Sequence, residues 1–258
     1  MTRKGSEVQS FVSAPMTPHL IYETKDFLIL NKPAGLLVHS DEAHKEPSLV
    51  DWLLENYPEI KGVGDEPNFR PGLVHRLDKE TSGILLVTKN QVSFDYYKNL
   101  FKEHHFTKIY LALTEGLPKD FSGFIDLPIG LKSGTVKRTV HTTHGNVKMV
   151  KSAKTNYNVL KTFSLCHAGV NATASDPKFA LIEVIPETGR THQIRVHLAA
   201  INCPIVGDSL YGKKKPSIKF PRQFLHASSL EFTDQAGSRL KFEAPLPEDL
   251  SGLLESLS

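Results

Sequence analysis

The sequence predicts an α+β fold with a mixed, mostly antiparallel sheet and flanking helices. Strand-like runs outnumber helical ones, and they are not separated by the regular helical crossovers that a doubly wound parallel sheet requires. The length of 258 residues suits one large domain or two small ones. Because no internal repeat and no Ser/Gly-rich linker divides the chain, we expect a loose tail over residues 1–18 and one domain over 19–258.

Strands are expected where apolar, β-branched runs lie between turn residues. The expected ranges are 20–23, 27–32, 36–40, 83–89, 107–114, 155–163, 179–186, 225–232 and 239–244. The sequence KPAG (32–35) predicts a turn between the second and third runs, because Pro fixes φ and Gly tolerates a positive φ.

Helices are expected where apolar residues recur at helical spacing. The expected ranges are 48–57, 91–104 and 191–202, with a last helix that starts near Pro247. Ser48, Asn90 and Thr191 are the predicted N-cap residues. Residues 130–154 carry few large apolar side chains, so we expect an extended loop or a hairpin there.

The composition is that of an ordinary soluble protein, with 40% hydrophobic and 23% charged residues. Charges interrupt the longest apolar runs every few residues, so we expect no membrane span. The N-terminus is polar and lacks the apolar segment of a signal peptide. Cys166 and Cys203 form neither a disulfide framework nor a CxxC pair, so we expect a cytoplasmic protein.

Charge is distributed unevenly, although the net charge is only +3. Between Leu127 and Ser175 there are seven basic residues and no acidic one. The seven are Lys132, Lys137, Arg138, Lys148, Lys151, Lys154 and Lys161. A second cluster comprises Lys213, Lys214, Lys215, Lys219 and Arg222. Such segregation is typical of a protein that binds a phosphate backbone. A solvated flexible loop explains a lysine run alone equally well.

The stretch HRLDKETSG (75–83) places charged residues directly before the apolar run ILLVT. Unpaired charge is costly to bury, so Arg76 and Asp78 need partners if this run is a core strand. An aspartate held near an arginine in a partly dry cleft stays ionised and can act as a nucleophile or a base. The alternative is that Asp78 caps a turn and Arg76 is an ordinary surface residue.

A second charged motif is PETGRTHQIRVHLA (186–199), in which Arg195 falls early in a predicted helix. The helix dipole disfavours a cation there, and the flanking Ile194 and Val196 are apolar. A buried carboxylate would explain this arginine, whereas a solvated side chain explains most helical arginines. Tyr110 likewise interrupts an aliphatic strand, where it either packs in the core or offers a stacking surface for a base.

Signals for metals and cofactors are missing from the sequence. GDSLYGKK (207–214) resembles a phosphate-binding loop, but Lys214 occupies the position of the hydroxyl residue and Pro216 opposes the following helix. No HExxH motif, no zinc spacing and no GxGxxG after a strand occurs. We therefore expect chemistry without a metal or a cofactor.

Together these segments closely resemble the RluA-type pseudouridine synthases. The resemblance rests on HRLDKETSG with GILLVTKN, on KIYLAL, and on GRTHQIRVHLAAINCPIVGDSLYG. YETKDFLILNKPAGLLVHS (22–40) is similar to the opening motif of the family, and FEAPLPEDL (242–250) to its closing strand and helix. The resemblance implies the pseudouridine synthase fold with a central RNA-binding cleft, in which uridine within RNA is isomerised without a cofactor.

The resemblance also implies roles for individual residues. Asp78 would be the essential carboxylate, Tyr110 the base-stacking tyrosine and Arg195 the partner of the aspartate. Arg76 would fill the gap left by the flipped nucleotide, and Ile194 would contact the flipped base. Further substrate contacts are expected from His75, Lys108, Thr191 and His192. Contacts to the RNA backbone are expected from Lys137, Arg138, Lys148, Lys151, Lys213 and Lys214.

Several alternatives stay open at this point. Asp78 could attack C1′, remove a sugar proton or add to the pyrimidine ring; we favour the two sugar-directed routes. Only about twenty residues precede the first motif, too few for the S4-type RNA-binding domain of many family members. We therefore expect the catalytic domain itself to select a compact stem-loop in rRNA or tRNA, as a monomer and without DNA or membrane partners. The competing hypotheses are a non-catalytic RNA-binding or RNA-chaperone protein and a hydrolase of glycosidic bonds.

Overall fold

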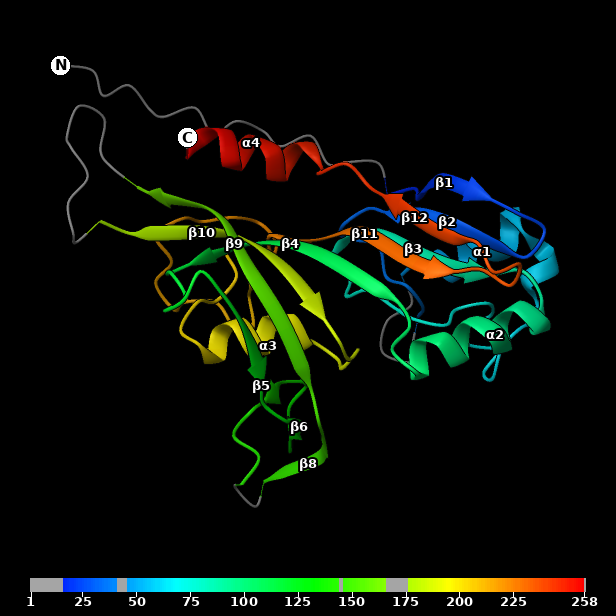
Figure 1. The fold of residues 1–258 in the computed structure, drawn as a ribbon, viewed down its shortest axis with the longest axis horizontal. Coiled ribbons are helices and arrows are strands. Elements are labelled where there is room, and N and C mark those ends of the chain that lie inside the picture. The colour runs from blue at the N-terminus through cyan, green and yellow to red at the C-terminus, as the bar shows by residue number, and fades with distance from the viewer. Residues whose placement is uncertain (1–15, 41–45, 144–145, 166–175, 258) are drawn as a thin grey trace.

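The computed structural model describes residues 16–40, 46–143, 146–165 and 176–257 (Figure 1). It confirms the predicted α+β class, because a long mixed sheet runs through the molecule with helices on its faces. The predicted N-terminal tail lies almost entirely outside the described residues. No helix among the described residues is long and apolar enough to cross a membrane.

Nine strands form the larger sheet. They are β1 (His19–Glu23), β2 (Phe27–Lys32), β3 (Ser82–Thr88), β4 (Thr107–Glu115), β5 (Ser122–Asp126), β9 (Lys154–Ser164), β10 (Lys178–Pro186), β11 (Leu225–Thr233) and β12 (Arg239–Glu243). Their order is β1-β2-β3-β11-β4-β10-β9-β5, with β12 paired to β11. The pairing of β3 with β11 is parallel, and the other described pairs in this sheet are antiparallel.

The parallel junction between β3 and β11 depends on a glycine. All seven residues of β3 are buried, so this strand lies in the interior, as its apolar run predicts. Gly83 has a φ of +116°, and a Cβ atom at this position would lie 2.2 Å from the carbonyl oxygen of Ala227. Only glycine allows the two backbones to approach this closely. The junction places the segment that precedes β3 in the middle of the sheet.

Four α-helices accompany the sheet within the described residues. They are α1 (Leu49–Asn56), α2 (Gln91–Lys102), α3 (Gln193–Ala200) and α4 (Glu248–Ser256), and a short 3₁₀ helix, η1 (Pro58–Ile60), follows α1. The Ser48 side chain accepts a hydrogen bond from the backbone of Asp51, and the Asn90 side chain accepts one from the backbone of Ser93. Both predicted N-caps are confirmed.

The predicted N-cap of the third helix is wrong. Helix α3 starts after His192 rather than after Thr191, and His192 adopts the left-handed conformation with a φ of 57°. A backbone in this conformation is costly for a non-glycine residue and occurs where the surrounding structure enforces it. Its side chain makes no capping hydrogen bond to the helix and points to other partners.

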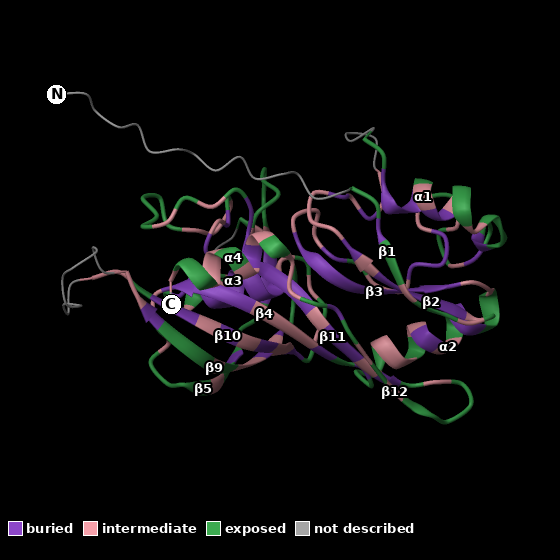
Figure 2. Cartoon of the chain, turned by 90° about the horizontal axis from the view of Figure 1, so that it is seen from above, coloured by how far each residue is buried: buried purple, intermediate pink, exposed green. Residues whose placement is uncertain are grey.

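Helices α1 and α2 cover opposite faces of β2 and β3 (Figure 2). Because side chains alternate along a strand, Leu28 and Leu85 pack with α1, whereas Ile29 and Leu86 belong to the cluster that contains Tyr97 of α2. Buried residues are concentrated in the central strands, whereas β9 is largely exposed (Figure 2). This half of the molecule forms a three-layer arrangement of helix, sheet and helix.

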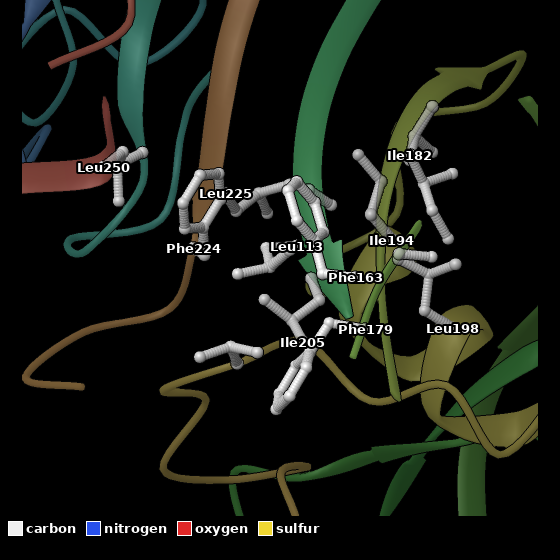
Figure 3. Packing of buried hydrophobic residues seen from close by; sticks show 14 of the residues in the cluster. Leu113, Phe163, Phe179, Ile182, Ile194, Leu198, Ile205, Phe224, Leu225 and Leu250 are labelled. Carbon is white, nitrogen blue, oxygen red and sulfur yellow. The ribbon is translucent and has the colours of Figure 1, made fainter. Parts of the chain in front are cut away.

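The other half is held by one large apolar cluster on β4, β9, β10 and β11 (Figure 3). Ile194 and Leu198 of α3 lie at one side of this cluster in the view, and Leu250 of α4 lies at the other. Burying each side chain of this size contributes about 1.5–3 kcal/mol to folding. The cluster fixes α3 against the sheet and so fixes the residues at the start of this helix.

Two sequence predictions are corrected in this part of the chain. Residues 36–40 do not form a strand; Leu37 makes an isolated bridge with Ser48, because the segment turns away after Gly35. Residues 130–154 are neither an extended loop nor a single hairpin. They contribute a second sheet of three strands, β6 (Ile129–Lys132), β7 (Arg138–Thr139) and β8 (Val147–Lys151), in the order β7-β6-β8. This small sheet projects from the body of the molecule beside α3 (Figure 1).

Candidate active site

A cleft of about 540 Å³ lies where the segment before β3, strand β4 and the start of α3 meet. It collects every residue that the sequence places at the reaction site. These are His75, Arg76, Asp78, Lys108, Tyr110, Thr191, His192, Ile194 and Arg195. They come from three segments that are far apart in the chain, so the tertiary fold brings together the motifs that the sequence presents separately.

The predicted contact between Asp78 and Arg195 is present. Arg195 Nη1 donates a hydrogen bond of 2.8 Å to Asp78 Oδ2. The arginine side chain is 7% exposed and that of the aspartate is 21% exposed, so the pair lies at the bottom of the cleft but remains in reach of solvent. Oδ2 is thus fixed by Arg195, whereas Oδ1 has no hydrogen-bond partner within the described part of the chain.

Asp208 is a second carboxylate partner of Arg195, and it was not predicted from the sequence. Arg195 Nε and Nη2 donate to its two oxygens over 2.7 and 2.9 Å. The Asp208 side chain is fully buried and also accepts hydrogen bonds from the backbone N–H groups of Leu210 and Tyr211. Arg195 therefore forms a fork on Asp208 and extends its remaining arm to Asp78.

The charges in this triad stabilise one another. Burial opposes the charge of Arg195, but the hydrogen bonds and the charge of Asp208, followed by those of Asp78, outweigh it and raise the pKa of the guanidinium. Burial would raise the pKa of Asp208, yet the hydrogen bonds from Arg195 and the backbone lower it below its ordinary value. The guanidinium is thus held as a fixed cation, which explains an arginine in the first turn of α3.

A buried lysine supports the segment that follows Asp78. Lys32, at the end of β2, is fully buried. Its Nζ donates to the carbonyl oxygens of Pro33, Leu36 and Lys79 over 2.8, 2.9 and 3.0 Å. The carbonyl of Lys79 also accepts from the backbone of Gly35. Three acceptors match the three protons of an ammonium group, although burial lowers the pKa of Lys32 to about 7.

The next two residues of this segment are held by the chain that enters β11. Arg222 Nη1 donates to the carbonyl of Glu80 over 3.3 Å, and its Nε and Nη2 form a fork on Asp249 of α4 over 2.6 and 2.9 Å. Gln223 Nε2 donates to Thr81 Oγ1 over 2.7 Å. The C-terminal helix therefore supports the backbone two residues after Asp78.

We call residues 78–82 the elbow segment. Its last residue, Ser82, shares a hydrogen bond of 3.0 Å with Nδ1 of the buried His226. Its first residue is linked to its fourth, because the backbone N–H of Thr81 donates to the carbonyl of Asp78. Each residue from 78 to 82 thus has a fixed partner, and this network holds the Asp78 carboxylate in one place.

His192 faces the same carboxylate from the other side. Its Nε2 lies 3.9 Å from Asp78 Oδ2, and its Nδ1 lies 2.9 Å from the hydroxyl of Tyr211. That hydroxyl accepts a hydrogen bond from the backbone N–H of Arg138 over 2.8 Å. If the hydroxyl donates in turn to Nδ1, the imidazole proton lies on Nε2, toward Asp78. Burial lowers the pKa of His192 against the opposing charge of Asp78, so the ring is neutral near pH 7.

The opposite wall of the cleft is aromatic and cationic. Tyr110 is half-buried between two core clusters, and burial, with the charge of Asp78, raises the pKa of its phenol. Burial also lowers the pKa of Lys108 to about 8, and its Nζ lies 6.0 Å from the centre of the Phe101 ring. His75 stacks on Phe101 and accepts a hydrogen bond of 2.9 Å from the backbone of Leu86. Burial lowers the pKa of His75 to about 3, so this histidine is neutral.

The remaining predicted substrate residues lie at the rim or in the floor of the cleft. Arg76 is exposed, and its Nη1 lies 3.4 Å from Nε2 of His39. Thr191 is exposed, whereas Ile194 is 6% exposed and presents apolar surface. Within the described residues, no three His, Cys, Asp or Glu side chains are grouped so that they could hold a metal ion.

The predicted RNA-backbone residues lie outside this cleft. Lys137 precedes β7, Arg138 lies on β7, and Lys148 and Lys151 lie on β8. Lys213 and Lys214 follow α3 on an exposed loop, where Lys213 Nζ lies 3.4 Å from Glu115 Oε1.

Several residues that support the site were not identified from the sequence, among them Lys32, Asp208 and Tyr211. Asp208 and Tyr211 lie within GDSLYG, where the resemblance to a phosphate loop drew attention to the lysines instead. Gly207 has a φ of +75°, and a Cβ atom on it would lie 1.9 Å from the carbonyl oxygen of Arg222, so it marks a tight turn before Asp208. A glycine followed by a carboxylate at a turn was the available signal. For Lys32, the available signal was its position at the end of the apolar run FLILNK (27–32).

Comparisons with known proteins show the family and the fold of this chain. Residues 26–200 match the family model described as RNA pseudouridylate synthase. The uncharacterised RNA pseudouridine synthase YlyB of Bacillus subtilis is 37% identical over 252 residues, which cover 97% of this chain and 76% of the relative. The ribosomal large subunit pseudouridine synthase D of Nitrosomonas europaea is 37% identical over 260 residues, which cover 96% of this chain and 68% of the relative.

Solved structures show the same fold. Human RNA Pseudouridylate Synthase Domain Containing 4 matches with a TM-score of 0.69 and 26% identity, covering 93% of this chain and 92% of the human chain. Human RNA Pseudouridylate Synthase Domain Containing 1 matches with a TM-score of 0.67 and 25% identity, covering 96% of this chain and 97% of the human chain.

Proposed function

The chain belongs to the RNA pseudouridylate synthase family, and from this premise we propose that it isomerises specific uridines in structured RNA with Asp78 as the catalytic carboxylate. Membership of the family makes the protein an isomerase that acts on RNA. The observation that supports the residue assignment is the carboxylate of Asp78, which lines the cleft and has one oxygen held by Arg195, while the other has no hydrogen-bond partner among the residues that the structure describes.

The reaction is redox-neutral and needs no co-reactant. The N1–C1′ bond of uridine breaks, the uracil ring rotates, and a C5–C1′ bond forms. C5 loses its proton, and N1 gains one. A fixed carboxylate can assist this change at the sugar, either by attack on C1′ or by removal of a sugar proton. We favour these two routes over addition to the ring, because a carboxylate held by a guanidinium is suited to stabilise positive charge that develops on the ribose.

Base flipping is required to bring a uridine to Asp78, and the rim of the cleft can support it. Extrusion of a base from a stack costs a few kcal/mol. The exposed Arg76 can offset part of this cost by stacking in the vacated space and by contacting a phosphate. Tyr110 keeps its phenol proton at neutral pH, because burial raises its pKa, and a neutral ring of this kind suits a stacking role. Ile194 would contact the flipped base from the floor.

Ribosomal or transfer RNA is the proposed substrate. The relative from Nitrosomonas europaea is named a ribosomal large subunit synthase, which favours rRNA. The basic residues on the small sheet supply further positive charge outside the cleft, as a structured target that extends beyond one nucleotide requires.

The test is release of tritium from RNA labelled at C5 of uridine. RNA from cells that lack this protein is incubated with the wild type and with Asp78→Asn, which has the same shape without the charge. We expect release by the wild type and none above background by the variant, with equal RNA binding by both. Equal release by both proteins would remove Asp78 from the chemistry.

The products also separate the competing hypotheses. RNA binding without any tritium release by the wild type would favour a non-catalytic RNA-binding protein. Free uracil or cleaved strands, detected by chromatography and on gels, would instead indicate a hydrolase of the glycosidic bond. Pseudouridine mapped at defined positions in the product RNA would support the isomerase and identify its target.

A further inference from the structure

A second, smaller pocket of about 150 Å³ adjoins the main cleft. Arg138 and Lys151 of the small sheet line one side of it. Gly189, Arg190 and Thr191, which also line the main cleft, form the other side. The two cavities therefore share residues 189–191 and lie next to each other.

All the charged residues that line this pocket are basic. It contains Arg138, Lys151 and Arg190, and none of its lining residues is acidic. The basic groups come from two separate parts of the chain, the small sheet and the turn before α3. Gathering three cations around one small cavity is unfavourable by itself, because like charges repel. The arrangement therefore predicts an anionic occupant.

Arg138 supplies a second, independent sign of a ligand. Its backbone N–H is fixed by the hydroxyl of Tyr211, so the residue has a defined position. Its side-chain Nε is buried, yet it has no hydrogen-bond partner among the described residues. A buried donor without an acceptor is rare in folded proteins and requires an explanation. Nε is shielded from solvent in this conformation, so an anion in the pocket would satisfy it after the Arg138 side chain rotates toward the pocket.

The other two cations are placed to complete the site. Arg190 donates from Nε to the carbonyl oxygen of Ser152 over 3.0 Å, which anchors its guanidinium. Its two terminal nitrogens have no hydrogen-bond partner among the described residues and can contact a ligand. Lys151 is exposed at the open side. Two planar guanidinium groups and one ammonium match the tetrahedral oxygens of a phosphate better than they match a single carboxylate.

We propose that this pocket binds one backbone phosphate of the RNA strand, next to the uridine that occupies the main cleft. The inference rests on the proposed function, because it takes the strand to be the substrate RNA. It goes beyond general electrostatic attraction, since it assigns a single phosphate to Arg138, Lys151 and Arg190. Such a contact would fix the register of the strand and so decide which nucleotide reaches Asp78.

The first test compares two charge-removing variants on the same sheet. Arg138→Met removes the guanidinium from the pocket, and Lys132→Met removes an exposed cation of β6 that does not line it. Binding of RNA from cells lacking the protein is measured over a range of salt concentrations. Arg138→Met should weaken binding roughly tenfold at low salt and reduce the slope of log K against log salt by about 0.7–0.9. The RNA affinity of Lys132→Met should stay within about twofold of the wild-type value.

The second test locates the phosphate. Phosphates of the modified stem-loop are ethylated at random, and the bound and free fractions are compared. Wild type should show interference at a phosphate adjacent to the isomerised uridine, and Arg138→Met should lose that one signal. If Arg138→Met is poorly folded by circular dichroism, Lys151→Met at the exposed side of the pocket should show the same loss. An identical interference pattern in the wild type and a folded variant would overturn the proposal.

The outcomes separate this inference from the proposed function. Tritium release by the wild type, with equal salt slopes for Arg138→Met and Lys132→Met, would refute the phosphate site and leave the isomerase intact. No release by the wild type, together with a selective loss of slope in Arg138→Met, would refute the isomerase and retain a phosphate site in an RNA-binding protein.

Discussion

The elbow segment and the small sheet are built in opposite ways. Residues 78–82 are held by side chains from β2, α3 and β11 and by the chain that enters β11. Along β8, by contrast, four of the five residues are exposed. The small sheet is joined to residues 210–211 through the backbone of Arg138 and through Lys137 Nζ, which donates to Leu210 over 3.1 Å.

The difference reflects what each region has to do. A carboxylate that acts on one carbon atom must be held within about 0.5 Å of its productive position, which requires packed and hydrogen-bonded neighbours. Outside the pocket at Arg138, the exposed surface of the small sheet needs charge more than position, because electrostatic attraction falls off gradually with distance. Variants in the elbow segment should therefore affect turnover and stability, whereas variants in the small sheet should affect binding.

The largest effect is expected from Arg195→Met. It leaves the fully buried Asp208 and the partly buried Asp78 without their cation, so we expect a loss of about 3–5 kcal/mol in the free energy of unfolding. Turnover should fall by at least roughly a thousandfold, because Asp78 is no longer held. Urea unfolding and tritium release measure the two effects.

Arg222→Met is the matched control for this prediction. Arg222 is buried to a similar degree and forms an equivalent fork on Asp249, but it contacts the elbow segment through the Glu80 carbonyl and not through Asp78. It should also lose stability, although less than Arg195→Met because the Asp249 side chain is 29% exposed, and it should retain far more turnover. Equal losses of turnover in the two variants would show that stability, rather than the position of Asp78, explains the effect.

Lys32→Met should have the next largest effect, and it should depend on pH. The folded protein loses the Lys32 proton near pH 7, whereas the unfolded chain keeps it up to about 10.5. The unfolded state then binds more protons, so this residue makes the stability of the wild type rise with pH between these values, by at most about 1.4 kcal/mol per unit. The gain in the free energy of unfolding that comes from the neutral form of Lys32 is lost as pH falls to 7.

The methionine variant removes this titration and leaves three carbonyl oxygens without their donor. Urea unfolding of both proteins at pH 7, 8 and 9 gives the comparison. The free energy of unfolding of the wild type should rise relative to that of the variant between pH 7 and pH 9. Parallel curves would mean that Lys32 keeps its proton throughout.

Tyr211→Phe should have an intermediate effect, because this residue joins the two regions. The variant removes the hydroxyl that contacts His192 and the acceptor for the Arg138 backbone. Turnover should fall about tenfold, while the unfolding free energy changes by about 1 kcal/mol. Nitrogen chemical shifts of His192 should show its proton on Nε2 in the wild type and a mixture of tautomers in the variant. A single unchanged tautomer would contradict the role of Tyr211.

The smallest effect is expected from Lys148→Met on the exposed face of β8. We expect RNA affinity to fall about twofold at low salt, with turnover and unfolding free energy unchanged. Filter binding measures the RNA affinity, single-turnover tritium release measures the turnover, and urea unfolding measures the stability. A large loss of turnover in this variant would show that the small sheet contributes to the chemistry and not only to binding.

The sequence by itself determined the local elements and the chemical types at the site. The apolar run of β3, the glycine that introduces it and the caps Ser48 and Asn90 depend on near neighbours, so their patterns were sufficient. Arg195 was noticed because its local environment is unfavourable for a cation. These features are set by backbone geometry and by the contrast between apolar and charged side chains within one element.

The tertiary structure decided which of these groups meet. Asp78 and Arg195 are 117 residues apart, and the resemblance to the family, not a local pattern, predicted their contact. Lys32 lies 47 residues from the carbonyl that it supports, and nothing in the sequence paired these two groups. The same holds for Asp208, whose role depends on a turn packed beneath α3, and for the small sheet, which its polar sequence did not reveal as strands. A buried charge is stable only when an oppositely charged or hydrogen-bonding group contacts it. The packing of the whole sheet determines which distant residue supplies that group.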